Sequence, residues 1–403
     1  MSGRVRVLVT DASRGSAIAF IRSLGRRGVQ VIAADHRPRS PGFRSRYASE
    51  RLLYPDPAVA PEAAIEELLD AAQRRRVDLI VPVTDEVLLP LSAARERFAG
   101  VCALALPDPD ALATVTDKRE TLALGRRLGV PTPRTAVAHS VDEALRAAAE
   151  LGWPVVVKPV ASRVYRNGAV EVLQVAYADG TRKLAEQVMR LDGRCPALLQ
   201  EYRPGEGVGV ELLADRGEPL AAFQHRRLHE VPITGGASAL RESVELDAEL
   251  YGHARRLLAA LRWTGLAMVE FRVGPQGPVL MEINGRIWGS LPLAVKSGVD
   301  FPLRLVELHL GRRLDARSDG RPVAGVRSRN LGLELVWIAS VLRRRRPYPF
   351  LPAPRRRDAL TAALRLPWPR DGFDVLCRDD PLPAVAELAA VTTRLARKAR
   401  HAA

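Results

Sequence analysis

Short apolar runs alternate with stretches of helical spacing through the first hundred residues, and this alternation restricts the fold more than any other feature of the sequence. Strands are predicted at residues 5–9, 29–33, 79–83 and 102–106, and helices at 17–24 and 62–73. Strands that alternate with helices generally pair in parallel and are covered by those helices. We therefore expect an α/β, Rossmann-like domain over residues 1–112.

Residues 113–312 follow a different pattern, in which strand signals outnumber helices. Helices are predicted from about 116 to 129, at 141–151 and at 247–261, and strands at 154–158, 169–176, 198–202, 208–213, 267–273 and 279–284. This order is typical of an α+β domain with antiparallel sheets. At roughly 100 to 200 residues per domain, the 403 residues leave room for a third unit, and we assign residues 313–403 to a basic C-terminal region.

The formal net charge of +15 suggests a nucleic-acid partner, but the residues behind that charge argue against one. Only five of the 61 basic residues are lysine, aromatic residues make up 5% of the chain, and no RNP-type or zinc-finger motif is present. Where arginine is the default cation, a retained lysine indicates a local need for a compact point charge.

Cellular location is inferred from three features of the sequence. The three cysteines have no metal-binding spacing, and no apolar run reaches the roughly 18 residues of a membrane span. The N-terminal residues become strand-like almost at once and contain no signal-peptide core. We expect a cytoplasmic protein without structural zinc or disulfides.

The turn at residues 10–16 lies where a Rossmann fold places its phosphate loop. It has one glycine and lacks the GxGxxG pattern, so a nicotinamide-dependent enzyme is disfavoured. Asp35 follows the second predicted strand, at the position of an acidic ribose ligand; the alternative is a solvated loop residue. Thr84-Asp85-Glu86 follows another strand, at the sheet edge where α/β proteins bind ligands.

A predicted hairpin carries the clearest chemistry. Two strands flank a five-residue loop, 274–278, and symmetry about Gln276 places Glu270 directly opposite Glu282. Like charges at facing positions destabilise a sheet, so something must compensate for them. Period-two alternation puts Asn284 on the same face and the apolar Met281 on the other. Two carboxylates and a carboxamide suit Mg²⁺, with Mn²⁺ as the alternative ion; the competing interpretation is an exposed carboxylate pair.

Two retained lysines could neutralise phosphates beside such a metal. Lys158 ends an apolar predicted strand, and Lys118 opens a helix, where the helix dipole disfavours a cation. Taken singly, each could equally be a surface residue. Between the lysines and the acids, an apolar strand runs into Glu201-Tyr202 and a Gly/Pro turn, which could present backbone groups to adenine, while Glu206 could bind a ribose. The alternative there is an ordinary turn.

These residues occur in a recognisable order along the chain. They are Lys118, Lys158, Gln200-Glu201-Tyr202, Glu206, Glu270 and Glu282-Ile283-Asn284-Gly285-Arg286. The set resembles the ATP-grasp superfamily of carboxylate-amine ligases over about residues 1–310. Its nearest branch holds carbamoyl-phosphate-synthase-like, biotin-carboxylase-like and D-aspartate-ligase-like proteins.

The resemblance implies a pre-ATP-grasp domain and ATP held between two α+β subdomains. The residues that it implies for ATP are Lys118, Lys158, Gln200, Glu201, Tyr202 and Glu206; for magnesium, Glu270, Glu282 and Asn284; and for the acyl phosphate, Arg286. The loop at 161–168 departs from the family pattern, because only one of its residues is glycine. Side chains such as Ser162, Arg163 or Arg166 would then have to replace backbone contacts to phosphate.

The expected activity is an ADP-forming ligase that activates a carboxylate as an acyl phosphate and joins it to an amine, giving an amino-acid or peptide-like product. Arg226 and Arg227 could clamp the carboxylate, and Gly235-Gly236 allows close backbone approach. His225 and His229 are candidate bases, with structural histidines as the alternative. A catalytically silent nucleotide-binding protein and an enzyme that forms carboxyphosphate from bicarbonate remain open.

The C-terminal region combines an apolar segment at 331–342, which contains Trp337, with arginines at 343–346 and 355–357. This composition fits a short amphipathic helix on the inner face of a membrane or against an acidic partner. The plainer interpretation is an accessory subdomain whose apolar segment packs on the ATP-binding part. The partners expected from the sequence are small-molecule carboxylate and amine substrates, and homo-oligomer formation is left open.

Overall fold

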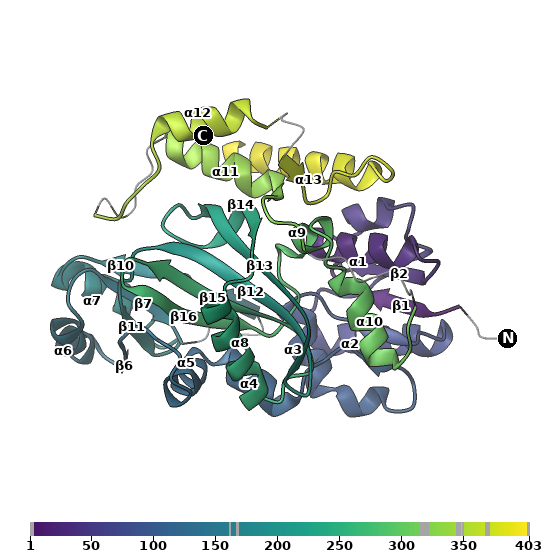
Figure 1. The fold of residues 1–403 in the computed structure, drawn as a ribbon, viewed down its shortest axis with the longest axis horizontal. Coiled ribbons are helices and arrows are strands. Elements are labelled where there is room, and N and C mark those ends of the chain that lie inside the picture. Colours follow the sequence, from purple (N-terminus) through teal and green to yellow (C-terminus); the bar gives the residue numbers. More distant parts are fainter. Residues whose placement is uncertain are drawn as a thin grey trace.

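The computed structural model describes residues 4–160, 163–166, 169–314, 322–343, 348, 350–366 and 371–400. The parallel N-terminal sheet and a large, mainly antiparallel sheet lie side by side (Figure 1). The C-terminal helices lie over both parts: α11 (Leu331–Leu342) contacts the large sheet, and α13 (Leu382–Arg400) contacts the N-terminal segment 41–44.

The first sheet has five parallel strands in the order β3-β2-β1-β4-β5. Its strands are β1 (Arg6–Val9), β2 (Gln30–Asp35), β3 (Glu50–Leu53), β4 (Leu79–Val81) and β5 (Ala103–Leu104), and its helices are α1 (Gly15–Gly25), α2 (Pro61–Arg74) and α3 (Asp85–Ala93). The sequence did not predict β3, because this edge strand buries only Leu52 and therefore lacks an apolar run.

Asp35 is neither solvated nor free to bind a ribose. Its side chain is fully buried and accepts hydrogen bonds from the backbone N–H groups of Ser13 (2.6 Å) and Arg37 (2.8 Å) and from the Ser40 hydroxyl (3.0 Å). The expectation of a solvated loop residue is therefore wrong. Asp35 instead ties the turn after β1 to the loop after β2, which fixes the position of the α1 N-terminus.

The rest of the described chain forms three further sheets. One has four strands in the order β10-β7-β11-β6, another has seven in the order β16-β15-β12-β13-β14-β17-β18, and the third pairs β8 (Arg163–Arg166) with β9 (Ala169–Val172). Their remaining strands are β6 (Thr135–Ala138), β7 (Val155–Pro159), β10 (Ala176–Ala178), β11 (Ala197–Glu201), β12 (Glu206–Asp215), β13 (Glu218–Val231), β14 (Ala237–Val244), β15 (Gly265–Gly274), β16 (Gly277–Asn284), β17 (Arg327–Arg329) and β18 (Asp371–Phe373).

Helices flank these sheets. They are α4 (Pro109–Thr116), α5 (Lys118–Arg127), α6 (Val141–Leu151), α7 (Thr181–Met189), α8 (Ala248–Ala260), α9 (Leu291–Lys296) and α10 (Phe301–Leu310). Helix α8 packs on β12 and β13, and α6 and α7 pack on the four-stranded sheet. The apolar face of α8 lies in one core with β12 and β15, so one surface of the large sheet is closed by packing and the other is left for a cavity.

The C-terminal region packs on the large sheet. In α11, Trp337, Ile338 and Val341 are buried with Ala239 of β14 and with α12 (Arg356–Leu364). The apolar residues that would have faced a lipid surface therefore lie inside the protein, as the plainer interpretation expected. The arginines at 344–346 lie outside the described residues. No described helix combines the length and the hydropathy needed to cross a membrane.

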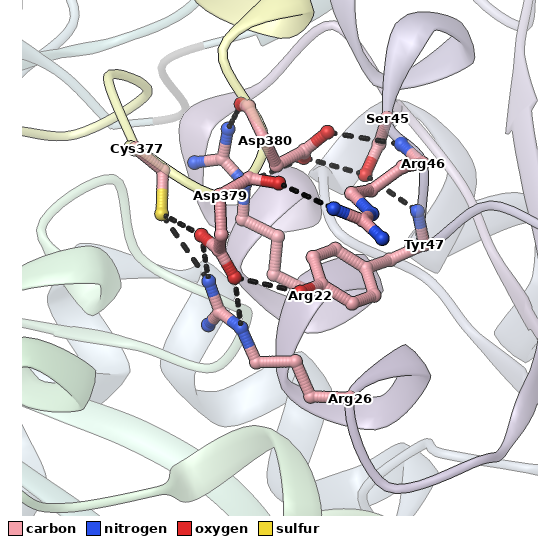
Figure 2. Close-up of polar contacts among 8 residues, drawn as sticks. All are labelled: Arg22, Arg26, Ser45, Arg46, Tyr47, Cys377, Asp379 and Asp380. Atoms are coloured by element: carbon pink, nitrogen blue, oxygen red, sulfur yellow. Dashed lines mark hydrogen bonds and ion pairs between the residues drawn. The ribbon is translucent and has the colours of Figure 1, made fainter.

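The segment after β18 is bound to the N-terminal domain through a buried ion pair. Arg22 of α1 donates from Nε to Asp380 Oδ2 at 2.8 Å and from Nη2 to the Asp380 carbonyl at 2.7 Å (Figure 2). The Ser45 hydroxyl (2.7 Å) and the Arg46 N–H (2.9 Å) complete the carboxylate's partners. Nearby, Arg26 pairs with Asp379, but these two side chains remain about two-fifths exposed.

Arg22→Gln is expected to lower the free energy of unfolding by about 3 kcal/mol, because it leaves the buried Asp380 carboxylate without its compensating charge. Arg26→Gln, at the C-cap position directly after α1, is the matched control and should cost less than about 1 kcal/mol, because water already screens its ion pair. Urea unfolding of both variants measures the difference. Equal losses would show that the buried pair does not secure the C-terminal segment.

Candidate active site

A cavity of about 610 Å³ opens between the four-stranded sheet, the seven-stranded sheet and the carboxyl ends of β1 and β4. Twelve residues were assigned from the sequence to ATP, to magnesium or to the carboxylate and acyl phosphate. Ten of them line this cavity: Lys118, Lys158, Gln200, Glu201, Tyr202, Arg227, Glu270, Glu282, Asn284 and Arg286. They come from separate helices and strands, and the fold brings them to one surface.

The other two, Glu206 and Arg226, are not among the residues that line the cavity. Glu206 begins β12 with a side chain that is 61% exposed. Arg226 lies on the opposite face of β13 from Arg227 and donates to Glu242 at 2.7 and 2.9 Å. The structure therefore does not bring these two residues to the remaining ten.

The β15–β16 hairpin places Glu270 directly opposite Glu282, but by a different route from the one predicted. Gly274 pairs with Gly277, so the turn has two residues rather than five, and the register near the turn is shifted by one. A bulge at Met281 inserts one extra residue into β16 and restores the pairing at the acids. The bulge also turns Met281 toward the cavity, so its predicted placement on the opposite face is wrong.

The two carboxylates are compensated by cations and by Asn284. Arg227 Nη2 lies 2.5 Å from Glu270 Oε1, and Asn284 Nδ2 donates to Glu270 (2.8 Å) and, more weakly, to Glu282 (3.4 Å). Burial and the neighbouring Glu282 raise the pKa of Glu270 despite Arg227. The interpretation as an exposed carboxylate pair is therefore wrong, since only 13% of the Glu270 side chain is exposed.

Glu282 behaves differently from its partner. Burial works against its charge, but Lys118, Lys158, Arg227 and Arg286 together outweigh burial and lower its pKa. One carboxylate of the pair is thus held firmly ionised while the other resists ionisation, which is the usual result of two like charges sharing a site. A cation placed between them would relieve this conflict.

The donor set fits a hard divalent ion. Within the described residues, no group of three or more histidine, cysteine, aspartate or glutamate side chains could hold a metal ion. Two carboxylates plus a carboxamide suit Mg²⁺, which takes its remaining ligands from water and phosphate. Asn284 now turns its N–H₂ toward Glu270, and rotation of the amide would present its oxygen instead.

Lys158 is buried, so its interpretation as a surface residue is wrong. It is 8% exposed in β7, and its Nζ donates to Gln200 Oε1 at 2.7 Å. Gln200, on the adjacent β11, is in turn held by Thr135, which accepts from its Nε2 at 3.1 Å. Burial lowers the pKa of Lys158 to about 8, with Glu282 and Glu270 opposing and Lys118 adding to the shift.

Two tyrosines also line the cavity, and Tyr202 meets Tyr177 edge-on at 6.2 Å. The Glu201 side chain is occupied by Arg134, whose N–H and Nε each donate at 3.0 Å. The Glu201 carboxylate is therefore already paired within the protein.

The two candidate histidines have structural partners. His225 is fully buried and paired with Glu211, and burial moves the pKa of His225 well below its usual value. His229 Nδ1 contacts Glu334 at 2.9 Å, and its ring stacks on Trp337 with centroids 3.6 Å apart. These contacts favour the structural interpretation of both residues.

Several residues that line the cavity were not anticipated. Arg272 lies two residues from Glu270 on β15, so period-two alternation alone could have placed it on the same face. Arg14 and Arg241 gave no such signal, because arginine is abundant throughout the chain. Asp85 follows β4 as expected and pairs with Arg286 at 3.1 Å. Ser162 lies outside the described residues, as do the side chains of Arg163 and Arg166.

Two family models match adjacent parts of the chain. One, an ATP-grasp domain, covers residues 110–195, and the other, an ATP-grasp in the biosynthetic pathway with Ter operon, covers 194–331. Together they span more than half of the protein and include both lysines, Lys118 and Lys158, and the paired acids, Glu270 and Glu282.

Curated relatives agree with the models. The chain is 28% identical over 303 residues to the carbamoyl phosphate synthase large chain of Thermus thermophilus, a match that covers 73% of this chain and 28% of that protein. It is 27% identical over 242 residues to the formate-dependent phosphoribosylglycinamide formyltransferase of Ignicoccus hospitalis, covering 56% and 54%. The chain thus spans under a third of the first relative and about half of the second.

Solved structures show the same fold. Biotin carboxylase from Campylobacter jejuni superposes with a TM-score of 0.61 at 17% identity, covering 77% of this chain and 72% of that one. N5-carboxyaminoimidazole synthase from Aspergillus clavatus gives 0.59 at 17% identity, covering 79% and 80%. From the adjoining family models, the curated relatives and the shared fold, we conclude that the chain belongs to the ATP-grasp superfamily.

Proposed function

We propose that the protein is an ATP-dependent ligase that activates a carboxylate as an acyl phosphate and joins it to an amine. The observation that carries this proposal is the convergence of Glu270, Glu282 and Asn284 with Lys118 and Lys158 on one cavity. Phosphoryl transfer requires positioning and charge neutralisation more than covalent help from the protein. These five side chains supply both.

The lysines are the proposed phosphate contacts. Lys158 is aimed by Gln200, and both lysines are near enough to Glu282 to lower its pKa. Glu270, Glu282 and the Asn284 amide would hold Mg²⁺, which, when bound, neutralises phosphate charge. Tyr202 and the Glu201 backbone would contact adenine, and no role is proposed for the exposed Glu206.

Arg286 and Arg227 are the proposed contacts of the carboxylate. Its oxygen would attack the γ-phosphorus of ATP and displace ADP, and an amine would then attack the acyl carbon and displace phosphate. Arg286 is oriented by Asp85 at 3.1 Å, and Arg227 by Glu270 at 2.5 Å. Both guanidinium groups can stabilise charge that develops on the transferring phosphoryl group.

ADP release in the presence of Mg²⁺ tests the proposal. The assay uses a panel of amino acids and small carboxylates, each with and without an added amine. Release that requires both a carboxylate and an amine is the expected result. Release with bicarbonate and no other carboxylate would indicate carboxyphosphate formation instead, and tight MgATP binding without release under any condition would identify a silent nucleotide-binding protein.

Nucleotide affinity should depend on pH through Lys158. The pKa of this lysine is about 8, below its ordinary value, so it loses its charge as the pH rises through 8. We expect MgATP affinity to be highest near pH 7 and to fall about tenfold between pH 7.5 and 9.5, since a charged contact is worth about 1.5 kcal/mol or more. Isothermal titration across this range provides the measurement, and a flat profile would contradict a phosphate contact by Lys158.

A further inference from the structure

Some residues that line the cavity have no part in the proposed nucleotide and metal contacts. They are Arg14, Gly15 and Ser16 at the N-terminus of α1, together with Arg241 and Trp288. Helix α1 runs for 11 residues from Gly15, and the side chain of its N-cap residue Arg14 makes no capping hydrogen bond. The N-terminus of a helix carries partial positive charge and exposed N–H groups, which suit an anion.

Arg241 supplies a second and independent sign of a ligand. Its side chain is only 1% exposed, yet it lines the cavity. Nη1 donates to the Ser238 carbonyl (3.1 Å) and Nη2 to the Gly289 carbonyl (3.4 Å). Its Nε and the indole N–H of the fully buried Trp288 have no hydrogen-bond partner within the described part of the chain. Buried donors are normally satisfied, so these two invite an acceptor from outside the protein.

Asp374 connects Arg241 to the helix terminus. It follows β18, pairs with Arg241 and accepts from the Ser328 hydroxyl at 2.7 Å. A Cβ on Gly15 would lie 3.3 Å from the Asp374 Cβ, so α1 and Arg241 both adjoin this residue. Asp374 lies beyond residue 331, where the matched family models end. The C-terminal region therefore helps to position a cavity-lining arginine.

We propose that Arg241, Trp288 and the first turn of α1 form an anion subsite for the amine substrate, which would carry a carboxylate or phosphate group besides its amine. The inference rests on the proposed ligase function for the identity of the occupant. Arg241 contacts Gly289, three residues after Arg286, so the subsite adjoins the segment proposed to hold the acyl phosphate. An acceptor anchored there by its acid would have its amine free to react.

Binding can be measured without turnover. With the triphosphate site filled by the magnesium complex of adenylyl imidodiphosphate, the protein is titrated with succinate, inorganic phosphate and the neutral succinamide while tryptophan fluorescence is followed. Trp288→Phe shows which part of the signal comes from the subsite. We expect saturation by succinate or phosphate and none by succinamide; the stronger of the two anions distinguishes a carboxylate from a phosphate acceptor.

Arg241→Gln should weaken anion binding at least tenfold and leave nucleotide affinity unchanged. Arg327→Gln is the matched control, and this variant should bind anions as the wild type does. In the pairing of β14 with β17, Arg327 lies opposite Glu242, whereas its neighbour Ser328 lies opposite Arg241. Asp374→Asn, which tests a positioning residue, should weaken anion binding without altering nucleotide affinity. Should Arg241→Gln fail to fold, Arg14→Glu at the exposed N-cap position reverses a charge that lines the cavity and should repel anions.

Two outcomes overturn the inference while leaving the proposed function standing. In the first, succinamide binds as well as the anions do; in the second, anion binding is unchanged in both Arg241→Gln and Arg14→Glu. In either case the nucleotide still binds and ADP is still released. Failure of the proposed function looks different, because the wild type then neither binds MgATP nor releases ADP with any carboxylate and amine. The two failures are therefore distinguishable in the same preparations.

Discussion

Glu282→Gln is expected to reduce magnesium-dependent ADP formation by about a thousandfold. The substitution keeps the size of the side chain but removes the carboxylate that Lys118, Lys158, Arg227 and Arg286 hold ionised. Without it, the cavity gains net positive charge and loses one of the two carboxylates proposed to hold Mg²⁺. Relieved of its like-charged neighbour, Glu270 should ionise at lower pH, so its remaining pairing with Arg227 should strengthen rather than break.

Glu242→Gln is the matched control for this loss. Glu242 lies in β14 of the same sheet and accepts from Arg226 and Arg327, and those ion pairs lower its pKa despite burial. It is not among the residues that line the cavity. Its substitution should cost stability, which urea unfolding measures, but leave ADP formation within about twofold of wild type. Full turnover in Glu282→Gln would remove the metal assignment.

The hairpin shows how a sequence argument can reach the right pairing through a wrong intermediate step. Symmetry about Gln276 placed Glu270 opposite Glu282, although the real turn has two residues and the offset is absorbed by the bulge at Met281. A bulge leaves no periodicity that a single sequence reveals, because one inserted residue exchanges the faces of its neighbours. The side on which Met281 lies could not have been predicted for that reason.

Strands β13 and β14 were missed for a different reason. Residues 224–230 are Gln-His-Arg-Arg-Leu-His-Glu, which reads as a polar loop rather than a strand. In the structure these side chains find partners on other elements, as His225 does with Glu211 and His229 with Glu334. Polar residues can occupy a buried strand when each is paired, but the pairing is set by tertiary contacts that local propensity does not contain.

The C-terminal region illustrates the same limit. The apolar run at 331–342 correctly predicted a helix, but whether it would meet lipid or protein depended on Ala239 and α12, which are distant in sequence. Likewise, nothing around Asp374 or Asp380 indicates that these acids reach Arg241 and Arg22. Patterns of residue type predicted the elements with clear apolar periodicity and most of the residues that line the cavity, whereas the polar strands and the long-range ion pairs required the fold.

Lys158→Met is the second substitution with a large expected effect, and it should lower kcat/KM for ADP formation by about 10²- to 10³-fold. Methionine fits the apolar strand but cannot contact a phosphate, and it leaves Gln200 Oε1 without its donor. Lys183→Met provides the control. Lys183 lies on α7 and pairs with Asp179, both side chains are 36% exposed, and the loss of Lys183 should leave kcat/KM unchanged. An equal effect of both variants would point to net charge rather than to a specific contact.

Stability gives a second and independent test of the same lysine. Because burial holds the pKa of Lys158 at about 8, the folded protein releases this proton between pH 8 and 10.5, whereas the unfolded chain retains it. The unfolded state then binds more protons, so stability rises with pH over this window, by about 3 kcal/mol in total. Lys158→Met cannot show this gain, and its unfolding free energy relative to wild type should fall by that amount from pH 8 to 10.5. If the difference in unfolding free energy between wild type and Lys158→Met stays constant from pH 8 to 10.5, Lys158 is solvated. A solvated lysine could not serve as the buried point charge on which the proposed phosphate contact depends.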